Sequence, residues 1–403
     1  VTGVQTCALP ICVLVGGTVF AQVISILTLP LITRLYTPSD FTLFAIYTSL
    51  LMILSSVSSL RFEIAIPLPD DDKEAVGLLC LALIFNFIIS ILILILIWLL
   101  HAEIILLLKQ KYFSQLIWLV PLGVFLFSTY NTFQYWATRK KNFTVIAKTK
   151  MVQSLSGVIV QILMGYWGFS AVGLILGQII KTSAGIKRLV LNFWHEANFL
   201  IKNVEFQYLK YVFKKNDQFP KYSSFDALAN TASIQLPIVI ISALMPGGSV
   251  GYLTLAMQLL AIPMQFIGGA ISQVYLSHVS EVKEKSDIRL YTRNVLENLY
   301  KYGFSILILI GILSPILVKY IFGDHWVKMG YLISWMIPWF IFQLAASPIS
   351  MIMHVFNKQR QMLLLTVFGF CIKIGMLYAQ YYIDSRYLLE NYAISSAIFY
   401  LIC

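Results

Sequence analysis

Charged residues are scarce in this 403-residue chain, where Asp, Glu, Lys and Arg together make up 12% of the sequence. A soluble domain carries about 25% charged residues, because it needs a solvated surface. Hydrophobic residues make up 59% of the chain, and its mean hydropathy is +0.81. So few charges cannot cover a 45.7 kDa globule. Most of the outer surface is therefore expected to face lipid.

The residue patterns of metal, disulfide and nucleotide chemistry are also missing. The five histidines make no metal-ligand pair at helical spacing, and no GxxxxGK[ST] sequence is present to bind ATP phosphates. We therefore expect no metal site, no cofactor and no direct coupling to ATP. The cysteines lack the paired spacing of a disulfide framework or a zinc site: Cys7, Cys12, Cys80, Cys371 and Cys403.

The formal net charge of +11 does not indicate a nucleic-acid partner. The basic residues lie between apolar runs and form no stripe of the kind that binds nucleic acid. Cytoplasmic loops of membrane proteins show this distribution under the positive-inside rule. We expect no nucleic-acid partner.

Continuous apolar runs fill most of the sequence, and a helix needs roughly 20 apolar residues to cross the hydrocarbon core. The runs do not alternate every second residue, which excludes a membrane β-barrel. The sequence therefore predicts an all-α polytopic membrane protein with about twelve transmembrane helices. The expected spans are 12–33, 41–60, 75–99, 115–137, 146–167, 171–189, 222–244, 250–275, 299–321, 330–354, 361–382 and 391–403.

Both ends of the sequence are unusual. Residues 1–11, VTGVQTCALPI, resemble the translation of a short-read sequencing adapter. A signal peptide is disfavoured, because no basic region precedes the apolar stretch. We leave these residues out of the fold prediction. The last run, 391–403, is too short to span a membrane, which predicts that the final helix is cut.

The distribution of Lys and Arg predicts the orientation in the membrane. Of the 29 basic residues, 21 lie in loops that follow even-numbered spans and 6 in loops that follow odd-numbered spans. The positive-inside rule then places the even-numbered loops and the N-terminus in the cytoplasm.

An internal repeat predicts two parallel halves. Leu29-Pro30, Pro38, Phe41 and Phe44 have counterparts at Leu236-Pro237, Pro246, Val250 and Tyr252, offset by 207 to 209 residues. Two six-helix bundles of this kind are a transporter design, with the substrate in a central cavity between the halves. We expect an N-terminal half at 12–189 and a C-terminal half at 222–403.

The connection at 190–221 is the longest predicted cytoplasmic segment. Apolar residues recur in it every four residues among lysines, which fits either an amphipathic helix on the anionic inner leaflet or a solvated linker helix. The apolar positions are Leu200, Val204, Tyr208 and Val212.

Four stretches carry a family resemblance: RLYTPSDFTLFAIYTSL at 34–50, LRFEIAIPLPDDDKEAVGLL at 60–79, FPKYSSFDALANTASIQLPIVIIS at 219–242 and the weaker IFGDHWVKMG at 321–330. They resemble the Wzx-type O-antigen flippases, polysaccharide-biosynthesis transporters of the multidrug/oligosaccharidyl-lipid/polysaccharide exporter superfamily. The resemblance implies alternating access in a bacterial inner membrane and a polyprenyl-pyrophosphate-linked oligosaccharide as substrate. Polysaccharide polymerase and chain-length proteins are the implied protein partners.

Four charged residues are candidates for contact with such a substrate, because charges inside a membrane usually face a bundle interior. Lys181 is expected near the middle of the sixth span, although its stem could also carry the ammonium to the headgroups. Lys373 is expected near the middle of the eleventh span and is the better candidate. Arg61 and Glu63 leave the second span two residues apart, so they do not share a helical face and each is expected to find a partner elsewhere. Arg61 fits bidentate binding of a pyrophosphate, or both residues have an interfacial, structural role.

Five uncharged or acidic polar residues complete the predicted substrate-binding set. Asp226 and Asn230 lie four apart on the seventh span, with Gln235 one turn further. They fit a cation-coupling or glycan-hydroxyl site, or a first-turn Asp stabilised by the helix dipole. Asn131 and Gln134, three apart on the fourth span, are suited to binding hydroxyls or to joining helices.

Three functions remain open. The first is an oligosaccharide-lipid flippase, with a proton or sodium ion as the possible coupling ion. The second is a cation-coupled multidrug antiporter of the same superfamily. The third, a membrane glycan polymerase or ligase, is disfavoured, because the longest odd-numbered loop, around 100–114, is short and holds no acid/base pair. The chain is therefore expected to be a transporter and not an enzyme.

Overall fold

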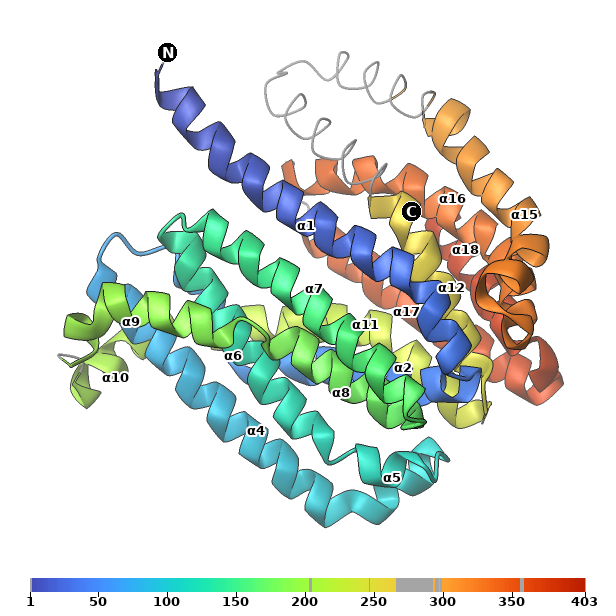
Figure 1. Cartoon of the computed structure of the whole chain (residues 1–403), viewed down its shortest axis with the longest axis horizontal. Coiled ribbons are helices and arrows are strands. Elements are labelled where there is room, and N and C mark those ends of the chain that lie inside the picture. The colour runs from blue at the N-terminus through green and yellow to red at the C-terminus, as the bar shows by residue number, and fades with distance from the viewer. Residues whose placement is uncertain are drawn as a thin grey trace. The chain divides into compact units, whose positions relative to one another are not determined.

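The computed structural model describes residues 2–202, 205–245, 247–265, 293, 297, 299–355 and 359–402. These residues are nearly all helical, and no strand occurs among them (Figure 1). The chain divides into two compact units. Unit 1 contains Val1–Tyr36 and Leu43–Leu236, and unit 2 contains Thr37–Thr42 and Pro237–Cys403.

Unit 1 is a bundle of long helices joined by several short ones. Within it α1 packs on α7, α7 on α8, and α4 on α6. Its helices are α1 (Thr2–Leu35), α2 (Pro38–Ser58), α3 (Phe62–Ala65), α4 (Asp72–Leu108), α5 (Phe113–Leu116), α6 (Leu119–Arg139), α7 (Phe143–Tyr166), α8 (Ser170–Ser183), α9 (Ile186–Lys202), α10 (Phe206–Lys215), η1 (Phe219–Ser223) and α11 (Ser224–Leu244). The boundary between the units falls inside α2 and α11.

Unit 2 is built around α16, which packs on α12, α15 and α18, while α17 packs on α18. Its helices are α12 (Ser249–Pro263), η3 (Leu299–Phe304), α15 (Ser305–Phe322), η4 (Asp324–Trp326), α16 (Val327–Val355), α17 (Gln359–Ile383), η5 (Ser385–Tyr387) and α18 (Leu388–Ile402).

Six segments of the described residues are long and apolar enough to cross a membrane. They are Gly16–Leu35, Pro38–Ser58, Asp72–Leu108, Phe219–Leu244, Leu299–Phe322 and Asp324–Ala346. The prediction of an all-α polytopic membrane protein is confirmed. The count of twelve spans and the cytoplasmic N-terminus stay predictions.

The sixth predicted span, 171–189, ends earlier than expected. The chain leaves α8 at Ser183 and restarts as α9 at Ile186, because Ala184 has a non-helical ψ of 129° and Gly185 has a φ of +95°. The eighth predicted span continues past residue 265, and that part lies outside the described residues.

Two of the stretches that carry the family resemblance come together in unit 2. The Thr42 hydroxyl, from the 34–50 stretch, accepts a hydrogen bond from the Gly251 amide at 2.9 Å. The Phe41 ring meets Trp326, from the 321–330 stretch, edge-on with 5.0 Å between ring centroids. These contacts tie the start of α2 to α12 and η4 and explain why small and aromatic residues occupy those positions.

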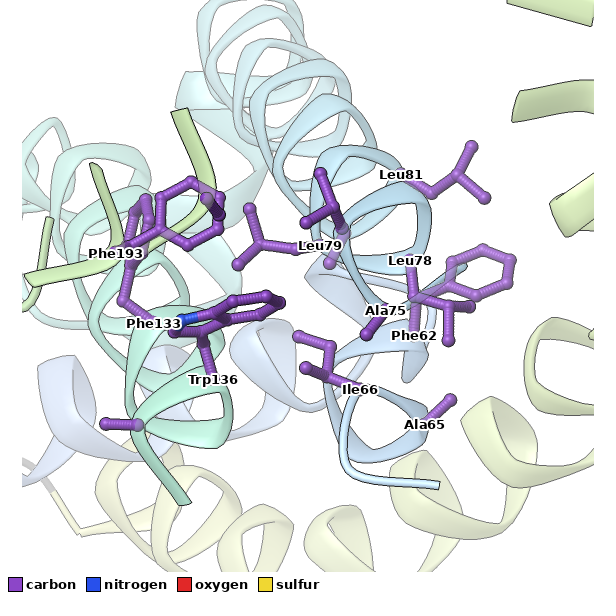
Figure 2. Packing of buried hydrophobic residues seen from close by; sticks show 14 of the residues in the cluster. Phe62, Ala65, Ile66, Ala75, Leu78, Leu79, Leu81, Phe133, Trp136 and Phe193 are labelled. Atoms are coloured by element: carbon purple, nitrogen blue, oxygen red, sulfur yellow. The ribbon is translucent and has the colours of Figure 1, made fainter. Parts of the chain in front are cut away.

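A hydrophobic cluster at one end of unit 1 fixes the short helix α3 (Figure 2). Phe62, Ala65 and Ile66 are fully buried there, and the Phe62 ring lies 5.9 Å from Phe85 on α4 and 5.6 Å from Phe213 on α10, between centroids. Trp136 on α6 packs edge-on against Phe193 on α9, with ring centroids 5.0 Å apart. The charged residues of the α2–α3 turn are therefore attached to a rigid core.

Candidate functional site

The α2–α3 turn places two of the predicted charged residues beside each other. Leu60 and Arg61 have φ values of +49° and +62°, so the chain reverses between α2 and α3 through two left-handed residues. Non-glycine residues adopt this conformation rarely and at a cost in free energy. The buried Phe62 and Ala65 that follow hold the turn in place.

Glu63 lies in α3, directly after this turn, and is 6% exposed. Its carboxylate accepts a hydrogen bond from the Ser59 hydroxyl at 2.5 Å and pairs with Arg61 Nη1 at 3.5 Å. Burial raises the pKa of the Glu63 carboxyl, against the lowering effects of Ser59 and Arg61. The expectation that Arg61 and Glu63 have separate partners is wrong, because Arg61 lies in a left-handed turn and helical spacing does not apply to it.

Arg61 keeps much of its hydrogen-bonding capacity unused. A guanidinium has five N–H donors, and its one hydrogen bond in the described structure is the long contact to Glu63. The Nε atom is buried without an acceptor, while the side chain as a whole is 31% exposed. Such a group is suited to binding an anion through its free donors.

The polar face of α6 adjoins this turn. Tyr135 interacts electrostatically with both Glu63 and Arg61. Asn131, one helical turn before Tyr135, and Gln134 are half-buried, and within the described part of the chain their side-chain amides make no hydrogen bond. We call Arg61, Glu63, Asn131, Gln134 and Tyr135 the turn site.

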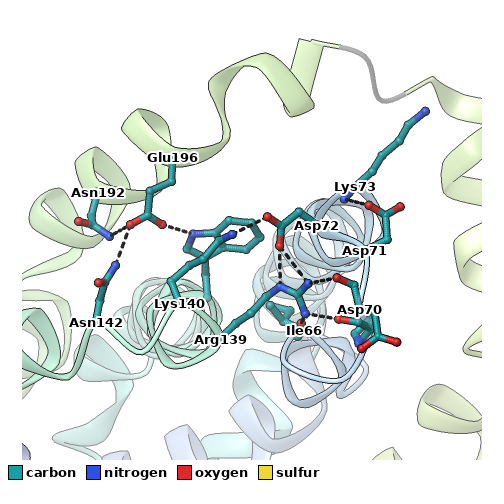
Figure 3. Close-up of polar contacts among 12 residues, drawn as sticks. Ile66, Asp70, Asp71, Asp72, Lys73, Arg139, Lys140, Asn142, Asn192 and Glu196 are labelled. Carbon is teal, nitrogen blue, oxygen red and sulfur yellow. Dashed lines mark hydrogen bonds and ion pairs between the residues drawn. The ribbon is translucent and has the colours of Figure 1, made fainter. Parts of the chain in front are cut away.

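A clamp of charged residues fastens the other end of α3 (Figure 3). The Arg139 guanidinium donates to Asp72 Oδ1 at 3.0 and 2.9 Å, to the Ile66 carbonyl at 3.4 Å, to the Asp70 carbonyl at 3.1 Å and to the Pro69 carbonyl. Lys140 pairs with the second Asp72 oxygen. A surface pocket of about 300 Å³ lies over this clamp, lined by Pro67, Leu68, Pro69, Asp70, Asp72, Arg139 and Lys140.

The prediction that Lys181 lies near the middle of its helix is wrong. Because α8 ends at Ser183, Lys181 is in the last turn. A Cβ added at Gly157 would lie 2.6 Å from the Lys181 Cβ, so the stem of this lysine packs directly on α7. The Lys181 side chain is half-buried against this neighbouring helix.

The three candidate residues on α11 differ in their exposure and contacts. Asp226, in the first turn, and Asn230, one turn later, are both exposed. Gln235 is half-buried and accepts a hydrogen bond from the Ser49 hydroxyl at 3.0 Å, which joins α11 to α2. Gln235 therefore has a helix-joining contact, whereas Asp226 and Asn230 are accessible.

Lys373 lies in the middle of α17, as predicted, and is surrounded by aromatic rings. Its Nζ is 5.0 Å from the Phe399 centroid, 5.5 Å from Tyr400 and 5.7 Å from Trp339. Each such contact stabilises a desolvated cation by roughly 0.5–2 kcal/mol. We call Lys373 and these three rings the lysine cage, which belongs entirely to unit 2.

Sequence reasoning missed the clamp residues Arg139 and Lys140, the neighbouring Tyr135 and the rings around Lys373. Arg139 has a signal that was available, since it is a basic residue at the end of a span. Nothing in the spacing indicates that its partners come from the turn at 66–72. Among the described residues, no three His, Cys, Asp or Glu side chains are grouped to hold a metal ion.

The fold defines a class of protein: a multi-pass helical membrane protein. Among solved structures, the chain is similar to a lipid II flippase MurJ in an inward closed conformation, at 12% identity and a TM-score of 0.77, over 96% of this chain and 85% of that one. An inward-facing multidrug-resistance transporter of the MATE family matches at 12% identity and a TM-score of 0.67, over 96% of both chains. The MATE multidrug transporter DinF-BH matches at 16% identity and a TM-score of 0.60, over 98% of this chain and 95% of that one.

The sequence identifies the family within this class. Residues 31–330 match the family profile described as polysaccharide biosynthesis protein. The chain belongs to this family. The comparison with curated proteins finds no match.

Proposed function

We propose that this protein is a flippase of the bacterial inner membrane. It moves a polyprenyl-pyrophosphate-linked oligosaccharide from the cytoplasmic to the outer face by alternating access, for the assembly of O-antigen, capsule or exopolysaccharide. The observation that carries the proposal is the match of residues 31–330 to the polysaccharide biosynthesis family. The lipid II flippase with a similar fold supports it at the level of architecture.

The charges of the two sites support an anionic substrate. A pyrophosphate is bound best by guanidinium and ammonium groups. Arg61 has unused donors, and Lys373 is a mid-helix cation held by aromatic faces. The side-chain amides of Asn131 and Gln134, which make no hydrogen bond to the described residues, are suited to sugar hydroxyls.

The second candidate, a cation-coupled multidrug antiporter, is favoured by the fold shared with the MATE transporters. The charge distribution argues against it. A positively charged Lys373 in the middle of a helix repels a cationic drug, and the buried carboxylate of Glu63 is already engaged by Ser59 and Arg61.

Complementation tests the proposal in cells. The gene is expressed in a strain that lacks its O-antigen flippase, together with the matching sugar-assembly genes, and surface polysaccharide is measured. We expect surface glycan to return. If the protein is present in the membrane and lipid-linked units still accumulate inside, the flippase proposal is wrong, and drug-efflux assays on the same strain test the antiporter.

A further inference from the structure

The helices α9 and α10 expose aromatic side chains on the face turned away from the bundle. Each helix has a buried side: Phe193 of α9 packs on α6, and Val212 of α10 packs on α4. Away from those buried side chains, Trp194 is 51% exposed, Phe199 79%, Phe206 82% and Tyr211 57%. Large exposed apolar side chains gathered on one segment mark an interaction surface.

Basic residues accompany these rings on α10. Phe206, Lys210 and Lys214 recur every four residues and therefore form one ridge of the helix. Both lysines are exposed. The helix carries three lysines and no acidic residue, and the third, Lys215, is directed to Glu74 at 2.8 Å. The free side of α10 is therefore both aromatic and cationic.

The packing of α10 fixes its level along α4. Lys73 Nζ lies 4.7 Å from the centroid of the Tyr208 ring, and a Cβ added at Gly77 would lie 3.1 Å from Val212. After Glu74, α4 has no Asp, Glu, Lys or Arg up to residue 102. A helix that crosses a membrane enters the hydrocarbon where its charges stop. The contacts of α10 with α4 thus span the headgroup level.

We propose that the exposed faces of α9 and α10 bind the anionic phospholipid headgroups of the adjacent leaflet. Lys210 and Lys214 contact lipid phosphates, while Trp194, Phe199, Phe206 and Tyr211 lie among the headgroups and upper acyl chains, where amphipathic rings are favoured. This surface is separate from the turn site and the lysine cage. It requires no particular transport substrate.

Depth-sensitive labelling of the whole protein tests this surface. The native cysteines are replaced by serine, and single cysteines are introduced as Phe206→Cys, Trp194→Cys and, as an exposed control in the 67–71 turn, Asp70→Cys. Each is labelled with an environment-sensitive fluorophore. The protein is reconstituted into vesicles of phosphatidylcholine alone or with phosphatidylglycerol, with and without lipids that carry a quencher near the headgroup.

We expect quenching at positions 206 and 194 that clearly exceeds quenching at position 70 and increases with phosphatidylglycerol. In the Lys210→Gln/Lys214→Gln variant, the phosphatidylglycerol-dependent part should fall, since each lysine contributes about fivefold in affinity for an anionic surface. If the headgroup quencher leaves the fluorescence at positions 206 and 194 unchanged in both kinds of vesicle, α9 and α10 are solvated linker helices and the proposal is wrong. If quenching does not depend on phosphatidylglycerol, or if the double variant shows the same dependence as wild type, the anionic headgroup is not the ligand.

Discussion

At the scale of single residues, the Arg61 guanidinium makes one hydrogen bond in the described structure and keeps its other donors for a ligand. Its contact with Glu63 is long, at 3.5 Å, and its Nε has no acceptor. The left-handed turn and the buried Phe62 hold its backbone without using the guanidinium. A group prepared in this way loses little freedom when it binds an anion.

Substitutions at Arg61 test whether transport needs only the positive charge of this side chain or also the planar shape of its guanidinium group. We expect Arg61→Gln to abolish surface polysaccharide and Arg61→Lys to retain part of it, because an ammonium keeps the charge and loses the planar fork that binds phosphate bidentately. Surface glycan and membrane levels of each variant are measured in the complemented strain. Wild-type glycan from Arg61→Gln at equal protein level would remove Arg61 from the substrate path.

Substitutions at Lys373 test whether transport needs the positive charge of this side chain. We expect Lys373→Met, which keeps the length and the contact with the rings, to reduce surface glycan at least tenfold while the protein remains folded. Lys373→Arg should retain most activity, because a guanidinium also stacks on aromatic faces. If Lys373→Met is fully active, the lysine cage has a packing role only.

The raised pKa of Glu63 predicts a pH dependence of stability. The folded protein binds the Glu63 proton more tightly than the unfolded chain does. The contribution of this group to the free energy of unfolding therefore rises as the pH falls through the raised pKa, and it levels off near the unfolded value of about 4.3.

The melting temperature of wild type and Glu63→Gln in detergent, between pH 8 and pH 5, measures this contribution. The difference between wild type and variant should shift in favour of wild type as the pH is lowered. A difference that is constant, or that shifts toward the variant at low pH, contradicts the role of burial at Glu63.

At the scale of elements, the clamp holds the turn at 66–72 against α6 and so positions α3. Arg139 is 9% exposed in its side chain, and its donors are used by one carboxylate and three backbone carbonyls. Removing it leaves those carbonyls without their donor and Asp72 with Lys140 alone. The turn site is joined to the clamp through α3 and through α6, so a loose clamp should also loosen Arg61.

We expect Arg139→Gln to lower the free energy of unfolding by roughly 1–3 kcal/mol. This range is below the cost of breaking a fully buried ion pair, because Asp72 is 40% exposed and water screens its charge. Arg139→Lys should recover less than half of that loss, since a single ammonium cannot reach all four acceptors. Thermal unfolding measures the stability, and alkylation of a cysteine placed at Leu60 measures the mobility of the turn. Unchanged alkylation in Arg139→Gln would mean that the core alone positions α3.

At the scale of the whole molecule, apolar length and charge scarcity were enough to predict the fold class. The end of the sixth span could not be predicted from hydropathy. Apolar character continues through Ile186, Leu189 and Val190, and the left-handed Gly185 that ends α8 leaves no trace in hydropathy. The displacement of Lys181 to a last turn follows from the break at Ala184 and Gly185.

The candidate sites were predictable only in part, for a similar reason. The rarity of charge inside a span singles out Lys373, but its three rings come from α16 and α18 and depend on tertiary packing. Arg61 and Glu63 were recognised as a pair of charges, whereas their mutual contact depends on a left-handed backbone that sequence spacing does not encode.

Direct observation of transbilayer movement tests the central claim most directly. The purified protein is reconstituted into vesicles with a polyprenyl-pyrophosphate oligosaccharide that carries a fluorophore on its sugar, and an impermeant reductant measures how much of it reaches the outside. We predict that wild-type protein exposes the label that protein-free vesicles keep protected, and that Arg61→Gln and Lys373→Met do not. A label that stays protected, in vesicles whose protein is folded and extrudes a cationic dye, would contradict the flippase account.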